Sequence, residues 1–271
     1  MKMLRLPKSK RRPDASPTVP GEGPLDGQSL SRYFPALEAD KLKQLAREMA
    51  LASFKRGNRV LSDLRSPTDV LLVLRGAIAV TWQHDSRHQV LVTLLAPGEM
   101  FSVSSSFLPE LTQGLKGYAF INSQVATINS SRLLNILLGV ELEAFKSATE
   151  ITMGWSFNAL MRYIKMFRLS PRDRLVIALI ELGAKFGVRD SRGLVLNLPM
   201  TQKDLASLLG ASRQKVNADF GELVSMGAVV NLRRPIVLVP EKLFALVDAS
   251  EIFRHGAAGP HFAAGVTTAL D

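Results

Sequence analysis

The stretch that most constrains this chain is 201-TQKDLASLLGASRQKVNADFGELVSMG-227. Apolar residues recur at helical spacing on both sides of Gly210, namely Leu205, Leu208, Leu209, Val216, Phe220, Leu223 and Val224. Thr201 and Ser212 suit the caps of two helices, and Gly210 can take the left-handed conformation that ends the first. Small Ala206 lies four residues before Gly210 and apolar Val216 six after it. This spacing predicts a helix-turn-helix.

The polar face of the second predicted helix carries side chains that suit the edges of DNA bases. Arg213, Gln214 and Asn217 lie off the apolar stripe near the start of that helix, where helix-turn-helix proteins contact bases. Arginine suits guanine O6 and N7, whereas glutamine and asparagine suit adenine. Ala218 and Gly221, further along this face, are small enough to let the helix lie deep in a groove. The alternative is an αα-hairpin with a solvated polar face.

Two short apolar runs after this motif, 228-AVVNL-232 and 236-IVLV-239, predict a wing hairpin. Their connection contains two adjacent arginines. Polar and basic side chains around the motif are expected to contact phosphates, namely Thr201, Ser212, Lys215, Arg233 and Arg234.

The first half of the chain has a different pattern. A helix is expected within 36-ALEADKLKQLAREMA-50, and apolar runs rich in Val, Leu and Ile follow at 59–64, 70–82, 89–101 and 117–128. Turn residues divide these runs at 56–58, at 83–88 and at Pro97-Gly98. Strands of this length predict an antiparallel β-roll or barrel.

Between the two halves, proline is absent from Glu141 to Leu169, which indicates a long helix. Apolar residues there alternate at spacings of four and three, the period of a coiled-coil seam, at Met153, Phe157, Leu160, Ile164 and Phe167. A helix packed on its own domain explains so short a seam equally well. Ser170-Pro171 is expected to end the helix and to mark a hinge.

Composition narrows the function. The formal charge is +10, which favours polyanionic partners, although six of the basic residues lie in the first dozen. Cysteine is absent, which excludes disulfides, thiolate zinc sites and cysteine-ligated iron–sulfur clusters. Neither a transmembrane run nor the apolar core of a secretory signal is evident, so a cytoplasmic location is expected.

The order of these parts resembles the Crp/Fnr superfamily of bacterial transcription regulators over roughly residues 30–245. The resemblance rests on Gly57 in 54-FKRGNRVL-61, Gly76 in 72-LVLRGAIAV-80, 97-PGE-99 and, most specifically, 201-TQKDLASLLGASRQKVN-217. It implies an α+β protein with an N-terminal antiparallel β-roll, a long dimerisation helix and a C-terminal winged helix-turn-helix. It also implies a homodimer that reads a two-fold-related DNA site, with an effector bound or sensed by the roll.

The candidate effector pocket departs from the pattern of the family members that bind cyclic AMP. Those members carry a Gly-Glu-Leu cassette after the Pro-Gly turn and an Arg-Ser pair further on, whereas this chain has Ser102-Val103-Ser104 and no arginine between Arg87 and Arg132. Ordinary recognition of cyclic AMP is therefore not expected. The residues left for an anion or another effector are Gly98, Glu99, Ser102, Ser104 and Lys116.

The serines of this stretch equally suit local turn hydrogen bonds without any ligand. His84 and His88 are expected in an exposed loop, and no metal site and no cofactor is predicted.

These features predict a sequence-specific, dimeric DNA-binding transcription regulator. An enzyme is not predicted, because no nucleophile elbow, phosphate-cradling loop, HExxH motif or catalytic residue is found. Two alternatives stay open: a regulator gated by a different nucleotide or small molecule, and a regulatory subunit that does not bind DNA. RNA polymerase is a candidate partner without an identified surface.

The predicted organisation has five parts. They are a disordered basic tail at 1–28, a cyclic-nucleotide-binding-like β-roll at 29–135, a dimerisation helix at 136–169, a winged helix-turn-helix domain at 170–248 and a C-terminal tail at 249–271.

Overall fold

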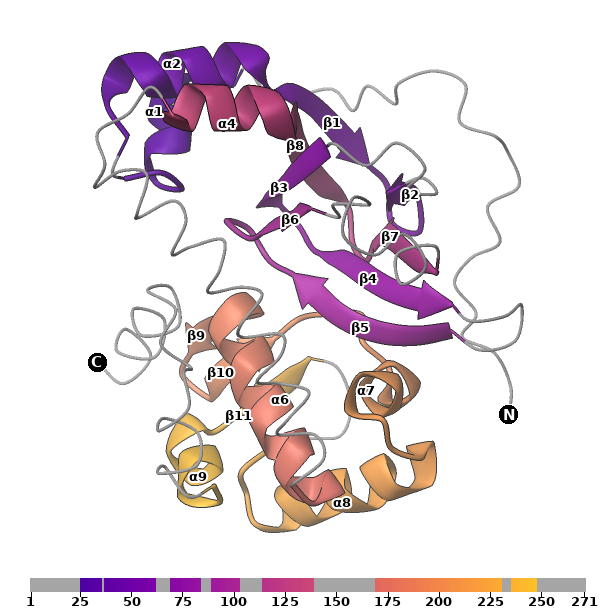
Figure 1. Ribbon diagram of the computed structural model, residues 1–271. Helices are drawn as coiled ribbons and strands as arrows, with labels where there is room; N and C mark the ends of the chain where they lie inside the picture. The colour runs from indigo at the N-terminus through magenta and orange to yellow at the C-terminus, as the bar shows by residue number, and fades with distance from the viewer. Residues whose placement is uncertain are drawn as a thin grey trace. The chain divides into compact units, whose positions relative to one another are not determined.

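The computed structural model describes residues 25–35, 37–61, 69–83, 89–102, 114–138, 169–230 and 235–247 (Figure 1). The chain divides into two compact units, with the boundary between Glu150 and Ile151. Within the described ranges, no helix has the length and apolar character needed to span a membrane.

The first unit contains two antiparallel four-stranded sheets. One has the order β1-β8-β3-β6 and the other the order β2-β7-β4-β5. The first sheet consists of β1 (Ala50–Phe54), β8 (Ser123–Asn129), β3 (Asp69–Arg75) and β6 (Met100–Ser102). The second consists of β2 (Arg59–Leu61), β7 (Leu115–Ala119), β4 (Ile78–Gln83) and β5 (Gln89–Leu95).

Strand β3 is apolar along most of its length because it contributes to two cores. Leu71 and Val73 pack with residues of β4, β5 and β7, so they join the two sheets. Val70, Leu72 and Leu74, one position out of phase, pack on the opposite face against helices. Since side chains alternate along a strand, an uninterrupted apolar run is what a strand buried on both faces requires.

Three helices cover the outer face of the first sheet: α1 (Gly27–Ser31), α2 (Ala39–Glu48) and α4 (Ser130–Leu138). Figure 1 shows them grouped beside β1, β8 and β3. Asp26 caps α1, because its Oδ1 accepts hydrogen bonds from the backbone N–H of Ser29 at 2.7 Å and from its hydroxyl at 2.6 Å. Leu42 and Leu45 of α2 are buried, as the predicted helix requires.

Several predicted boundaries in this unit are wrong. Residues 25–28 belong to the fold rather than to a disordered tail, and the predicted helix ends at Glu48, since Ala50 already begins β1. Helix α4 crosses the boundary predicted at residue 135, and residues 139–168 of the dimerisation helix predicted at 136–169 lie outside the described residues.

Two predicted strands are each divided by a turn. The run 70–82 forms β3 and β4, which are separated at Gly76, where φ is 85°. A Cβ at Gly76 would collide with Oγ of Ser123, so this turn requires glycine on both counts. The run 117–128 forms β7 and β8, because residues 120–122 turn the chain.

The second unit is built on helix α6 (Pro171–Phe186). Ser170 caps this helix, accepting the N–H of Asp173 at 3.2 Å, and Pro171 occupies its first turn. Ser170-Pro171, predicted as a helix stop, begins helix α6 in the structure. The elements that follow are β9 (Gly187–Asp190), β10 (Gly193–Leu196), α7 (Gln202–Leu209), α8 (Arg213–Ser225), β11 (Ile236–Leu238) and α9 (Pro240–Ala245).

The predicted wing is part of a three-stranded sheet with the order β11-β10-β9. Strand β11 pairs with β10, and residues 228–230 contribute one bridge, between Val229 and Leu238, instead of a strand. The β9–β10 hairpin is absent from the sequence prediction. The segment 187-GVRDSRGLVL-196 is short, and its centre, residues 189–192, is polar, so its pattern does not distinguish a strand from a loop.

Candidate nucleic-acid interface

Helix α7 has a well-formed N-terminus. Oγ1 of Thr201 accepts the N–H of Asp204 at 3.1 Å, and Oδ2 of Asp204 accepts the N–H of Thr201 at 2.8 Å. This reciprocal capping box satisfies two backbone donors at the helix start. Leu205, Ala206 and Leu209 are buried, so α7 is held by packing as well as by its cap.

The turn between α7 and α8 has the geometry that the sequence predicts. Gly210 has φ 59° and ψ 35°, in the left-handed region, and the N–H of Ala211 donates to the carbonyl of Ala206 at 3.0 Å. Ser212 then caps α8 by accepting the N–H of Lys215 at 3.2 Å. Ala206 and Val216 are 6% and 1% exposed, which confirms the predicted close crossing of the two helices.

The C-terminal ends of both helices of the motif accept hydrogen bonds from cationic side chains of neighbouring helices. Nη1 of Arg174, on α6, donates to the carbonyl of Leu209, the last residue of α7, at 2.7 Å. Nζ of Lys242, on α9, donates to the carbonyl of Met226 after α8 at 3.3 Å. Because the last carbonyls of a helix lack intrahelical partners, these contacts stabilise the motif from outside.

One face of α8 is open to solvent. Val216, Phe220 and Leu223 point into the core, with at most 2% of each exposed. Arg213, Gln214, Asn217 and Ala218 are exposed on the other side, and a Cβ built at Gly221 would have nothing within 4 Å. The structure therefore brings the three predicted base-reading side chains together on one accessible helix face, beside two small residues.

Asn217 is held from the neighbouring helix. Nε2 of Gln202, the first residue of α7, donates to Oδ1 of Asn217 at 2.8 Å. Sequence reasoning did not single out Gln202. The only feature of the sequence that pointed to Gln202 was its polar side chain at the start of the predicted helix.

Lys215 has a different environment from the phosphate contact predicted for it. Its Nζ lies 2.6 Å from Oδ1 of Asp219, one turn along α8, and Asp219 is completely buried. The hydrogen bond to this carboxylate raises the pKa of Lys215 above the ordinary value for lysine. The prediction from sequence did not include Asp219, because an aspartate within a polar stretch gives no sign of burial.

The other predicted phosphate contacts are placed as follows. Thr201 and Ser212 are exposed, and both hydroxyls serve as helix caps. Arg233 and Arg234 lie outside the described residues, as do all five residues of the predicted dimer seam, Met153, Phe157, Leu160, Ile164 and Phe167.

Among the candidate effector residues of the first unit, the structure describes Gly98 and Glu99 in one turn. Gly98 has φ 88° and donates its N–H to the carbonyl of Val73 at 2.8 Å, and Oε2 of Glu99 accepts the N–H of Ala96 at 2.7 Å. The Glu99 carboxylate therefore closes its own turn. Ser102 ends β6, and Ser104 lies outside the described residues.

Lys116 lies on the outer face of its sheet. Its neighbour Leu115 packs against the core shared by the two sheets, and side chains alternate along β7. Nζ of Lys116 donates to Oε1 of Gln83 at 2.8 Å. Ser104, Ser105 and Ser106 lie outside the described residues, so the expected approach of Lys116 to the serine-rich stretch stays a prediction.

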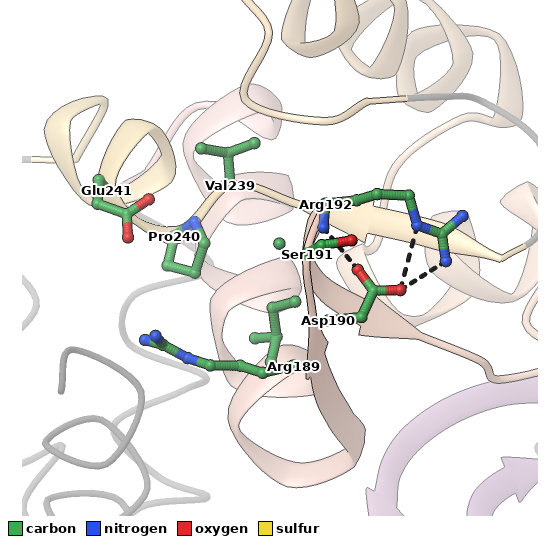
Figure 2. Close-up of a pocket in the computed structure, with 9 residues that line it drawn as sticks. Arg189, Asp190, Ser191, Arg192, Val239, Pro240 and Glu241 are labelled. Carbon is green, nitrogen blue, oxygen red and sulfur yellow. Dashed lines mark hydrogen bonds and ion pairs between the residues drawn. The ribbon is translucent and has the colours of Figure 1, made fainter.

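A cleft of about 300 Å³ lies beside the β9–β10 hairpin, lined by residues 189–194 and 239–241 (Figure 2). Figure 2 shows Arg192 turned onto Asp190, where Nη2 and Oδ2 are 2.6 Å apart. This hydrogen bond lowers the pKa of Asp190. Basic Arg189 and acidic Glu241 line the same cleft, a mixed set that favours no single class of ligand.

Comparison with known proteins agrees with this geometry. Residues 173–246 match the Crp-like helix-turn-helix domain. The chain is 21% identical over 202 residues to the CRP-like cAMP-activated global transcriptional regulator of Mycobacterium tuberculosis. The match covers 72% of this chain and 86% of that protein. It is 24% identical over 199 residues to the global nitrogen regulator of Synechococcus elongatus, with the same two coverages.

The fold is similar to that of FixK2 from Bradyrhizobium japonicum. The TM-score is 0.62 at 20% sequence identity, and the match covers 74% of this chain and 98% of that one. This likeness confirms the predicted α+β architecture, with antiparallel sheets in the first unit and a helix-turn-helix in the second.

Proposed function

We propose that this chain, a member of the Crp/Fnr superfamily of transcription regulators with a helix-turn-helix DNA-binding domain, acts as a cytoplasmic homodimer that reads a two-fold-related duplex site. The observation that carries the proposal is the exposed face of α8. Arg213, Gln214 and Asn217 lie together there, on a helix whose opposite face is fixed in the core.

The chemistry of this face suits the major groove. Arg213 can donate two hydrogen bonds to guanine O6 and N7, and Gln214 can donate to and accept from adenine. Ala218 and Gly221 add little bulk beyond the first turn, so the helix can approach the base edges closely. Thr201 and Ser212, together with Arg233 and Arg234 of the wing, are the proposed phosphate contacts.

The proposed dimer forms along the helix within 136–169, through Met153, Phe157, Leu160, Ile164 and Phe167. The alternating spacing of four and three supports it, because this is the period of two helices packed along a seam. A two-fold axis would place the two copies of α8 on half-sites about one helical turn of DNA apart.

The proposed regulator is not gated by cyclic AMP in the usual way. Support comes from the missing arginine of the cassette and from the Glu99 carboxylate, which accepts the N–H of Ala96. A different nucleotide or small molecule bound by the first unit is the second candidate. RNA polymerase remains a proposed partner, and no enzymatic role is proposed.

Selection of duplexes from a randomised library by the full-length protein tests the proposal. The wild-type protein is expected to enrich a two-fold-related sequence, and Arg213→Ala with Gln214→Ala should abolish enrichment of that sequence. Arg189→Ala is the matched control, because it removes an exposed arginine of the same unit that lies outside α7 and α8. Unchanged enrichment by the double variant would refute the assigned base-reading face.

A further inference from the structure

The hydrogen bond between Gln202 and Asn217 joins the two helices of the motif at the surface proposed to meet DNA. The donor is Nε2 of Gln202 and the acceptor is Oδ1 of Asn217, at 2.8 Å. Asn217 is exposed on the base-reading face of α8, whereas Gln202 is half-buried at the start of α7. The partner of this base-reading side chain therefore comes from the other helix.

This contact orients the Asn217 amide. A terminal amide has a carbonyl oxygen on one arm, which accepts, and an NH₂ group on the other, which donates two hydrogen bonds. With Oδ1 turned to Gln202, the Nδ2 arm is turned away from α7. Within the part of the chain that the structure describes, the Asn217 side chain makes no second hydrogen bond, so both N–H groups of Nδ2 are available to a ligand.

We infer that Gln202 is a specificity-determining positioning residue, which fixes the Asn217 amide so that its N–H donors face the DNA. This inference rests on the proposed DNA-binding function. Acceptors in the major groove are guanine O6 and N7, adenine N7 and thymine O4, whereas cytosine N4 and adenine N6 are donors. At the point that Asn217 contacts, the protein should prefer an acceptor.

The fold of α7 does not depend on this contact. The capping box of Thr201 and Asp204 satisfies the helix start, and buried Leu205, Ala206 and Leu209 anchor the helix. Substitutions at Gln202 can therefore change the orientation of the Asn217 amide while the motif stays folded.

Two substitutions of opposite hydrogen-bonding polarity test the inference. In Gln202→Lys the new side chain only donates, so Oδ1 of Asn217 keeps its partner and Nδ2 still faces the DNA. In Gln202→Glu the new carboxylate only accepts, so Nδ2 turns toward α7 and Oδ1 faces the DNA. A carboxylate in the first turn also suits the helix dipole, so the fold should tolerate Gln202→Glu.

The experiment measures base preference at every position of the duplex that the wild-type full-length protein selects from a randomised library. The position read by Asn217 is the one at which Asn217→Ala loses preference. We expect a preference of about tenfold for an acceptor there in the wild type and in Gln202→Lys. Gln202→Glu should lose it or prefer a donor, with the other positions unchanged. Thermal unfolding of each variant verifies that the domain is folded.

The double variant Gln202→Ala/Asn217→Ala adds an independent measure. If Gln202 acts through Asn217, the double variant should discriminate no less than Asn217→Ala alone. An unchanged acceptor preference in Gln202→Glu would overturn the inference and leave the proposed function standing. If Asn217→Ala, Arg213→Ala and Gln214→Ala all selected the wild-type sequence, the proposed function itself would fail.

Discussion

The ammonium of Lys215 lies 2.6 Å from Oδ1 of Asp219, and Asp219 is completely buried on the inner side of α8, the helix proposed to read DNA. Half of the Lys215 side chain remains exposed. The pair thus holds the Lys215 ammonium against its own domain. The Asp219 carboxylate balances the charge of the ammonium without a DNA phosphate. Oδ2 of Asp219 has no hydrogen-bond partner among the described residues, so Lys215 is the contact that balances the carboxylate.

Replacing Asp219 with asparagine should release the ammonium of Lys215 toward DNA. We expect stronger non-specific binding and a log–log dependence of affinity on salt that steepens by about one unit per subunit, since one more phosphate is neutralised. Titrations of a duplex at several salt concentrations measure this slope. Lys215→Ala/Asp219→Asn is the control and should return the slope to that of the wild type. Equal slopes for Asp219→Asn and the wild type would contradict the prediction.

Replacing Lys215 with methionine should lower thermal stability, because it leaves a buried carboxylate without its cation. The pKa of Lys215 is raised chiefly by its hydrogen bond to Asp219, with Glu222 also raising it and Arg172 lowering it. A lysine whose pKa is raised on folding stabilises the fold fully at pH values below its ordinary pKa. This stabilisation is lost as the pH rises through the raised pKa.

The difference in Tm between the wild type and Lys215→Met should therefore be constant from about pH 6 to about pH 9 and shrink above about pH 10.4. Calorimetry across this range measures it. A difference that grows at alkaline pH would show that the Asp219 contact is not its source.

Replacing Gly221 with alanine should change stability and DNA binding in opposite directions. The Cβ would have nothing within 4 Å, and glycine inside a helix is less stable than alanine by about 0.5–1 kcal/mol, so the free energy of unfolding should rise by about that amount. DNA affinity should fall, because the added methyl lies on the face proposed to enter the groove.

Gly183→Ala in α6 is the matched control for this change. There a Cβ would lie 2.9 Å from Cδ2 of Leu194 and 3.1 Å from Cδ1 of Leu238, so the gain in the free energy of unfolding should be smaller than at Gly221 or lost. Chemical denaturation and duplex titration measure the two effects. A Gly221→Ala protein that bound DNA as tightly as the wild type would remove the argument for a close approach at this position.

Replacing Leu160 with glutamate should convert the proposed dimer into monomers, since a charge at the centre of an apolar seam would be buried without a partner. Ile164→Glu should do the same, and DNA affinity should fall because the two copies of α8 would no longer bind together. Analytical ultracentrifugation measures the oligomeric state. Asn158→Glu, which lies off the seam by the same spacing, should leave a dimer. Dimers in all three variants would exclude this seam.

The features predicted correctly from the sequence are those decided within a few residues. The helix-turn-helix depends on the left-handed Gly210, on the caps at Thr201 and Ser212, and on the helical period that places Val216 inside and Arg213 outside. Each of these follows from local backbone geometry, which is why the accessible face of α8 could be identified before its packing was known.

Strand boundaries needed the tertiary structure. The run 70–82 is apolar apart from Arg75, Gly76 and Thr81, and the turn at Gly76 that divides it into two strands packs against Ser123, far away in the sequence. Strand β1 and the β9–β10 hairpin lack a strong period of their own, and they are strands because partners lie alongside them.

The sequence by itself determined which side chains of α8 face outward, because that depends on helical period. Only the tertiary structure decided what those side chains can offer to DNA. Asn217 is oriented by Gln202, fifteen positions away, and Lys215 is drawn to an aspartate whose burial depends on the helices packed around it. Hydrogen-bond polarity and charge balance are set by neighbours in space, and a pattern along one helix carries no record of them.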